Sequence, residues 1–416
     1  MSAPGPQGRI LVVDTNAAFV KSLTGHLQQA GFEVLPAASG RAAMAITDEQ
    51  AFDLILLSMD LPDMSGTDVL EGLRLRFPPS ELPIIVNASA DATADILNAL
   101  HLGANDCISA DVERDILVAR IRNNVNLKRT AEELRATHHS LSRMQRKLEH
   151  DLQAAARIQK NQLPAEDLEI DGWEVAWQAV PCDTLGGDSL NIFQLDDENW
   201  AMFVLDVSGH GVPASLLAVS VTRILTPGRD GSGRHDTLLP PRPLGDVRGT
   251  RESGSVASAV YVLERLQEKF VPEEDAVQYF TIVYATLNTR TGEMRIASGG
   301  HPSPILMRSG KSPEVFTDPD GPAIGLIPID LDIHFHEAEL QLAPGDTLLL
   351  YSDGVVEAFN PEQKLFGPEK LKRCLQIHAA HPLPHAVQGI HAEVQRWRDS
   401  KPQKDDETLL AIRRVN

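Results

Sequence analysis

The stretch ILVVDTN (Ile10–Asn16) begins with a short run of branched apolar residues that ends at an aspartate. Similar short runs follow before residue 124, and segments with helical spacing separate them. Apolar runs without polar alternation are typical of strands buried on both faces, and helical segments between them suit crossover connections. The sequence therefore predicts a doubly wound parallel α/β domain over residues 1–124. The further runs are VLPA (Val34–Ala37), DLILL (Asp53–Leu57), PIIV (Pro83–Val86) and NDCIS (Asn105–Ser109).

A long helix is predicted from about Asn124 to Asn161, which gives a linker over residues 125–162, since no proline falls between Pro83 and Pro164. His138 and Gln145 occupy two a positions of its heptad, and a leucine seam with polar a positions describes a dimeric coiled coil of modest stability. A single helix packed on its own domain is the alternative interpretation. The d positions of the heptad hold leucine at every seventh residue, namely Leu127, Leu134, Leu141 and Leu148.

Residues 163–416 are rich in strand patterns, many of which alternate apolar with polar residues. This alternation is typical of antiparallel sheets, so an α+β domain is predicted, with sheets flanked by helices. Helices are expected at Pro213–Leu225 and Ser255–Phe270, separated by a Gly- and Pro-rich loop at Pro227–Gly254.

The overall composition limits the class of protein. The 416 residues suggest two or three domains. The formal net charge of −20 argues against nucleic acid or an anionic membrane as a direct partner. Three scattered cysteines, Cys107, Cys182 and Cys374, form no CxxC motif. With no signal-peptide pattern and no long apolar run, a cytoplasmic location is expected.

The first domain resembles the receiver domain of two-component response regulators. That resemblance implies a phosphorylation site of five residues, and most of them differ here. Asp14 of the metal-binding acidic pair is retained, but Thr15 replaces its partner. Ser58 occupies the position of the phospho-accepting aspartate. The position of the hydroxyl residue holds Ala88, or Ser89 after a one-residue slip, and that of the lysine holds Ala110.

These replacements predict a degenerate receiver. A serine hydroxyl cannot form the acyl phosphate that this chemistry requires. Asp60, two residues after Ser58, is an alternative acceptor, although a solvated loop acid is the simpler interpretation. We therefore expect the domain to act as a binding module or dimerisation platform that responds to an unidentified protein signal.

Five aspartates of the last domain each follow or adjoin an apolar strand-like run. Carboxylates at strand ends can project into one place, and oxygen ligands without a His or Cys cluster suit Mg²⁺ or Mn²⁺. Two such ions could clamp a phosphate for hydrolysis. The motifs are LGGDSLNIF (Asp188), LDVSGHG (Asp206), LYSDGVVEAF (Asp353) and KDDETLL (Asp405, Asp406).

These motifs resemble those of the PPM-type (type 2C) protein phosphatases, in the bacterial branch of SpoIIE and RsbU. Further similarity lies in AARIQKNQLP (Ala155–Pro164), SGGHPSPILM (Ser298–Met307), GPAIGL (Gly321–Leu326) and FGPEKL (Phe366–Leu371). The resemblance implies catalytic roles for Asp188, Asp206, Asp353 and Asp405. It implies that Asp206, Asp353 and Asp405 bind one metal ion, and that Asp188, Asp206 and the Val207 carbonyl bind the other. Asp406 would bind through water or support the other ligands.

Several residues near these motifs allow more than one interpretation. Many relatives have a second acid where this chain has Asn191, and no residue matches the phosphate-binding arginine of eukaryotic members. His210 and His301 are possible general acids, but both lie in Gly-rich turns and more simply shape strand ends. Cys182 is expected to pack rather than to act as a nucleophile.

The resemblance implies a phosphatase of a partner-switching pathway, acting on a phosphorylated STAS-domain anti-anti-sigma protein. The architecture of receiver, helical linker and phosphatase also resembles RssB-type regulators, some of which are adaptors that bind a sigma factor without catalysis. The retained aspartates favour the enzyme. A transcription factor is excluded because no basic DNA-reading domain is present.

Overall fold

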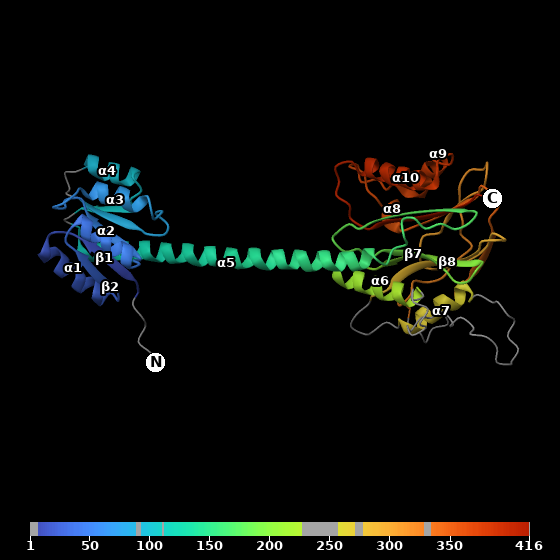
Figure 1. Cartoon of the computed structure of the whole chain (residues 1–416), viewed down its shortest axis with the longest axis horizontal. Coiled ribbons are helices and arrows are strands. Elements are labelled where there is room, and N and C mark those ends of the chain that lie inside the picture. Colours follow the sequence, from blue (N-terminus) through green and yellow to red (C-terminus); the bar gives the residue numbers. More distant parts are fainter. Residues whose placement is uncertain are drawn as a thin grey trace. The chain divides into compact units, whose positions relative to one another are not determined.

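The computed structural model describes residues 7–88, 93–109, 112–226, 257–270, 278–327 and 334–415. The chain divides into two compact units, Met1–Lys147 and Leu148–Asn416 (Figure 1). Ser89, Ala110 and the predicted loop Pro227–Gly254 lie outside the described residues.

The first unit contains a parallel sheet in the order β2-β1-β3-β4-β5, which confirms the predicted doubly wound fold. Two apolar clusters cover its faces, because the strands have buried side chains on both sides. The strands are β1 (Arg9–Val13), β2 (Glu33–Ala37), β3 (Leu54–Ser58), β4 (Ile84–Ala88) and β5 (Asp106–Ser109). The helices between them are α1 (Ala17–Gln29), α2 (Gly40–Glu49), α3 (Gly66–Arg74) and α4 (Thr93–His101).

Side-chain caps fix where the first helices begin. The Asn16 side chain accepts a hydrogen bond from the Phe19 N–H at the start of α1, and Ser39 caps α2. Ser65 and Asp68 form a reciprocal capping box on α3. Such caps satisfy backbone N–H groups that have no partner within the helix.

The predicted linker is part of one helix, α5 (Arg114–Lys160), which begins ten residues before the Asn124 start expected from the sequence. The buried side chains of α5 are Leu117, Ile121 and Val125, which pack on the receiver sheet. The apolar periodicity of the receiver's last helix therefore runs directly into the leucine heptads.

The second unit has two antiparallel sheets of five strands, in the orders β13-β10-β9-β8-β7 and β12-β11-β14-β15-β6. This confirms the predicted α+β class. The first sheet contains β7 (Ser189–Gln194), β8 (Asn199–Val207), β9 (Phe280–Asn288), β10 (Glu293–Gly299) and β13 (Glu337–Gln341). The second contains β6 (Trp173–Val180), β11 (Ile305–Met307), β12 (Glu314–Val315), β14 (Thr347–Tyr351) and β15 (Glu407–Arg414).

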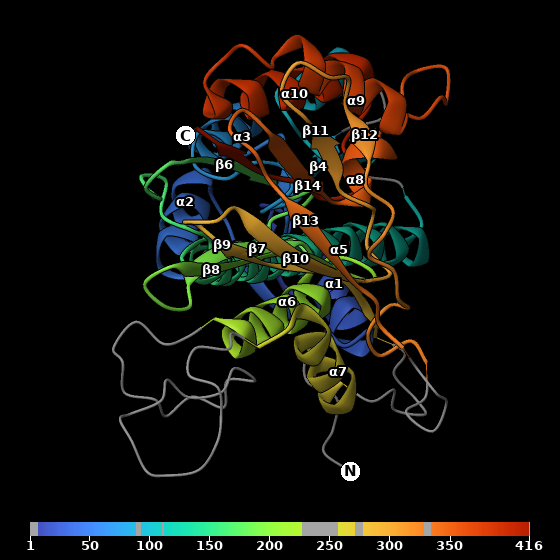
Figure 2. The same cartoon turned by 90° about the vertical axis from the view of Figure 1, so that its right-hand side faces the viewer.

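An apolar cluster with residues from both sheets, among them Met202, Val204 and Leu350, lies between them. Helices cover the outer faces (Figure 2). On one side are α6 (Val212–Leu225) and α7 (Ala259–Lys269), and on the other are α9 (Gly367–Ile377) and α10 (Leu383–Arg398). Among the described residues, α-helices that combine the length and apolar character of a membrane span are absent.

Candidate active site

The aspartates singled out in the sequence lie at strand ends of the two facing sheets. Asp188 immediately precedes β7, and Asp206 is the penultimate residue of the neighbouring β8. Asp353 begins the short helix α8 (Asp353–Val356) after β14. Asp405 and Asp406 immediately precede β15, the neighbour of β14. Each sheet therefore contributes a pair of adjacent acidic strand ends.

Asp406 joins these motifs through its buried carboxylate. Its Oδ2 accepts hydrogen bonds from the N–H groups of Gly187, at 2.6 Å, and Asp188, at 3.1 Å. Its Oδ1 accepts one from the Cys182 N–H at 2.7 Å. Asp406 thus holds the loop that leads into β7, and backbone N–H groups occupy both of its oxygens. This geometry favours the supporting role among those considered for Asp406.

Glycines are required where the motifs approach each other. A Cβ on Gly186 would lie 2.7 Å from Asp406 Oδ2, and a Cβ on Gly187 would lie 2.9 Å from the Val207 carbonyl oxygen. A Cβ on Gly354 would collide with the Asp406 carbonyl. The Gly-Gly-Asp and Asp-Gly pairs therefore allow backbone from both sheets to come together.

Burial and the charges of neighbouring aspartates raise the pKa values of Asp188, Asp206 and Asp405. Burial, and then the charges of Asp206 and Asp406, raises the pKa of Asp188 well above its usual value. Burial, followed by the charges of Asp353 and Asp405, raises the pKa of Asp206 to about 7. The pKa of Asp405 is also raised, first by burial and further by the charges of Asp353 and Asp406. A concentration of buried negative charge is typical of functional sites.

The donor set fits a hard cation. It consists of carboxylates and the Val207 carbonyl, and oxygen donors suit Mg²⁺ or Mn²⁺. Asp188 Oδ2 is buried and has no hydrogen-bond partner among the described residues. Within the same described ranges, no group of three Asp, Glu, His or Cys side chains forms a ready-made metal site. The fit thus rests on donor chemistry, mutual repulsion and the unpartnered Asp188 oxygen.

Asn191, where the sequence resemblance led us to expect a second acid, has its side chain engaged in local hydrogen bonds. Its Nδ2 donates to Thr226 Oγ1 at 3.1 Å, and its Oδ1 accepts from the Ile192 N–H at 2.8 Å. These contacts connect β7 to the end of α6.

The two histidines and the cysteine near the motifs differ in environment. His301 is buried beside Thr281, whose Oγ1 lies 2.8 Å from His301 Nδ1, and burial lowers its pKa to about 3. A neutral, enclosed imidazole suits a structural role. His210 is exposed between two glycines with positive φ. Burial, and then the charge of Asp406, raises the pKa of the Cys182 thiol to about 12, which argues against a nucleophile.

Two residues in contact with these motifs were not identified from the sequence. Ser352 Oγ donates to the Asp406 carbonyl at 3.3 Å and accepts from the Thr408 N–H at 3.0 Å. Gln159, in the last turn of α5, bonds to the backbone of Gly186. Gln159 lies within the motif Ala155–Pro164, so the sequence did indicate that this segment matters. The motif alone, however, does not show which residue Gln159 contacts.

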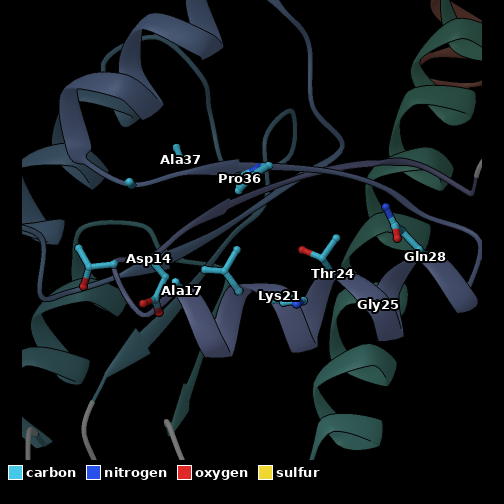
Figure 3. A pocket seen from close by; sticks show the side chains of 11 residues that line it. Asp14, Ala17, Lys21, Thr24, Gly25, Gln28, Pro36 and Ala37 are labelled. Atoms are coloured by element: carbon cyan, nitrogen blue, oxygen red, sulfur yellow. The ribbon is translucent and has the colours of Figure 1, made fainter.

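In the receiver, Asp14, Ser58 and Ala88 lie at or next to the carboxyl ends of the adjacent strands β1, β3 and β4. Asp14 Oδ1 accepts from the Asn16 N–H at 2.8 Å, and Ser58 Oγ lies 3.4 Å from the Asp60 backbone. Asp14 and Thr15 also line an open groove of about 600 Å³ between α1 and β2 (Figure 3).

Comparison with known proteins supports both the receiver fold of the first unit and the phosphatase-like fold of the second. Residues 196–415 match the family described as Stage II sporulation protein E (SpoIIE), and residues 10–122 match the response regulator receiver domain. Phosphoserine phosphatase RsbP of Bacillus subtilis (strain 168) is 23% identical over 262 residues, 63% of this chain and 57% of RsbP. Phosphoserine phosphatase RsbU of the same organism is 24% identical over 277 residues, 67% of this chain and 74% of RsbU.

A solved structure supports the same fold. The SiaA-PP2C domain of Pseudomonas aeruginosa matches with a TM-score of 0.50 and 22% identity, covering 65% of this chain and 98% of that domain. The chain spans about half the length of several curated relatives that it matches.

Proposed function

The chain belongs to the SpoIIE family, whose match covers more than half of it, and we propose that it is a metal-dependent serine/threonine phosphoprotein phosphatase. A response regulator receiver domain precedes the phosphatase-like fold. We assign the phosphatase domain to residues 163–416, the linker to residues 125–162 and the receiver to residues 1–124.

The observation that carries the proposal is the set of acids at neighbouring strand ends, where partial burial and the charges of nearby aspartates raise the pKa values of Asp188, Asp206 and Asp405. Asp206, Asp353 and Asp405 would hold one Mn²⁺ or Mg²⁺ ion, and Asp188, Asp206 and the Val207 carbonyl the other. Bound ions would polarise the phosphoryl group and lower the pKa of water. The chain supplies orientation, since Asp406 fixes the loop before Asp188.

The names of the relatives support a phosphoserine substrate. RsbP and RsbU are phosphoserine phosphatases. By analogy, the substrate of this chain is a phosphorylated STAS-domain anti-anti-sigma protein in a partner-switching pathway. The negative net charge suits a protein substrate better than a nucleic acid.

The receiver is proposed to act by binding rather than by phosphorylation. Ser58 occupies the acceptor position at the end of β3, and Thr15 replaces an acid beside Asp14. A protein that binds this domain would then provide the signal.

The linker supports a homodimer. Leu127, Leu134, Leu141 and Leu148 are 69%, 69%, 63% and 60% exposed, at heptad spacing on one helix. A second copy of α5 would cover this seam in a coiled coil, because leucine at each d position packs against its counterpart.

Phosphate release from a phosphoserine STAS protein tests the function directly. The full chain should release phosphate only with Mn²⁺ or Mg²⁺, and Asp206→Ala should lower the rate by several orders of magnitude while the chain stays folded. Metal-independent or absent release by the wild-type chain would reject the enzyme and favour a sigma-factor adaptor. Near wild-type turnover of folded Asp206→Ala would reject the proposed metal site.

A further inference from the structure

The last turn of α5 is bonded directly to the loop that carries Asp188. Gln159 is half-buried, and its carboxamide makes two hydrogen bonds to one residue. Its Nε2 donates to the Gly186 carbonyl at 2.7 Å, and its Oε1 accepts from the Gly186 N–H at 3.3 Å. A two-point contact of this kind fixes the peptide planes on both sides of Gly186, because both groups must face the carboxamide.

The same loop is held from the other side by Asp406. The N–H groups of Gly187 and Asp188 both point to Asp406 Oδ2. Neither Gly186 nor Gly187 has room for a side chain. A Cβ on Gly186 would lie 2.7 Å from Asp406 Oδ2, and a Cβ on Gly187 would lie 2.9 Å from the Val207 carbonyl oxygen. The loop therefore lies between two polar side chains, one on α5 and one beside β15, and Asp188 is the next residue along.

Apolar packing at the end of α5 is sparse. Ile158, the neighbour of Gln159, is 61% exposed, and the buried side chains of α5 all lie in its first half. The hydrogen bonds of Gln159 to Gly186 thus connect the end of α5 to the loop that precedes Asp188. A rotation or shift of this turn would act on Gly186 first and on Asp188 through it.

We propose that Gln159 is a positioning residue that sets the place of Asp188 for metal binding and so couples the end of α5 to the phosphatase site. The inference rests on the proposed function, since it takes Asp188 as a metal ligand. It identifies the route by which a change in the linker would alter activity: the helix end, Gly186, and then the Asp188 carboxylate.

The test compares the full-length wild-type chain with Gln159→Ala, Gln159→Glu and the control Gln153→Ala. Gln153 is an exposed glutamine on the same helix, six residues earlier. Mn²⁺ binding is measured by titration calorimetry, phosphate release is measured against Mn²⁺ concentration, and thermal unfolding is recorded without metal. Gln159→Glu retains the acceptor and the side-chain length but loses the donor to the Gly186 carbonyl.

Both Gln159 variants should bind Mn²⁺ about 10- to 100-fold more weakly, the usual loss when a residue that supports a metal ligand is changed. High Mn²⁺ should restore their turnover, and their melting temperatures should stay close to wild type. Gln153→Ala should behave as wild type. Rescue by metal separates a positioning role from general damage to the fold.

The outcomes are distinguishable. Wild-type Mn²⁺ affinity and metal dependence in either folded Gln159 variant would overturn the inference and leave the proposed function standing. A wild-type chain that neither binds Mn²⁺ nor releases phosphate would overturn the proposed function and the inference together. Unfolding of Gln159→Ala at every Mn²⁺ concentration, together with unaltered binding by Gln159→Glu, would also reject positioning.

Discussion

The Asp406 carboxylate accepts a 2.6 Å hydrogen bond from the Gly187 N–H, although the two residues are 219 positions apart. Asp406 is 4% exposed and also serves the N–H groups of Asp188 and Cys182. Removing it leaves one buried and two partly buried backbone N–H groups without this acceptor. The Asp-Asp pair before β15 therefore combines two roles that mutation can separate.

Asp406→Ala should destabilise the chain by about 3 kcal/mol, because each buried N–H left unpaired costs about 1–3 kcal/mol. Phosphate release should fall as well, since the loop before Asp188 loses its anchor. Chemical denaturation measures the first effect and phosphate release the second.

The matched control is Asp405→Ala. The Asp405 carboxyl accepts a hydrogen bond from the neighbouring Asp406 N–H. Burial, and then the repelling charges of Asp353 and Asp406, raises its pKa. Its removal should leave metal-free stability unchanged or higher while abolishing phosphate release. Equal destabilisation by the two substitutions would contradict this division of roles.

Metal-free stability should depend on pH through Asp206. Burial, and then the charges of Asp353 and Asp405, raises its folded-state pKa to about 7, whereas a carboxyl in an unfolded chain titrates near about 4. Between these values the folded chain binds the proton more tightly. Stability in chelator should therefore fall as pH rises from about 4 to 7, by an amount on the order of 3 kcal/mol.

Asp206→Asn should flatten this dependence and be more stable than wild type at pH 8 in chelator. Added Mn²⁺ should reverse the order, since ligands that bind the folded state stabilise it. Denaturation at pH 5 and pH 8, with and without Mn²⁺, measures both effects. If the free energy of unfolding of wild type and of Asp206→Asn changed equally with pH, Asp206 would not titrate as stated.

The receiver should not accept phosphate. Incubation with acetyl phosphate and Mg²⁺ should leave the intact mass of the full chain unchanged, because we assign the acceptor position to Ser58, which cannot form an acyl phosphate, and the second acid position to Thr15. Mass spectrometry with hydroxylamine treatment distinguishes aspartyl phosphate, which hydroxylamine cleaves, from phosphoserine, which it leaves intact, and Asp60→Asn serves as the control. A hydroxylamine-labile phosphate at Asp60 would restore a conventional switch.

Much of the fold was predictable because local patterns determine it. The run Asp53–Leu57 indicated a buried parallel strand, and the observed β3 lies one residue further on. The helix expected at Pro213–Leu225 begins at Val212. The start of α5 was wrong by ten residues, since periodicity alone does not distinguish packing on the receiver from the heptads that follow.

The tertiary contacts of the site were not predictable in the same way. The motifs placed Asp188 and Asp206 at strand ends, but no spacing indicates that Asp406 holds the loop of Gly187 or that Gln159 bonds to Gly186. Such contacts depend on how two sheets and a helix end meet, and a single sequence contains no signal for that.

The last prediction concerns the linker. Its d-position leucines are exposed, while the a positions at the centre of the seam hold His138 and Gln145. Polar residues at a positions lower coiled-coil stability and allow alternative packings that differ by only a few kcal/mol. Replacing both with leucine should strengthen the seam, so the dimer should persist at protein concentrations at least about tenfold lower. Light scattering across a dilution series measures this.

If the dimer controls catalysis, turnover per chain should change with dilution in the wild type and stay constant in the His138→Leu and Gln145→Leu double variant. The matched control places leucine at His139 and Arg146, which are exposed positions one residue outside the seam. The control should dissociate like wild type, because its new side chains do not face the partner helix. A wild-type chain that is monomeric at all concentrations, or a control that dimerises as tightly as the double variant, would exclude the leucine seam as the means of control.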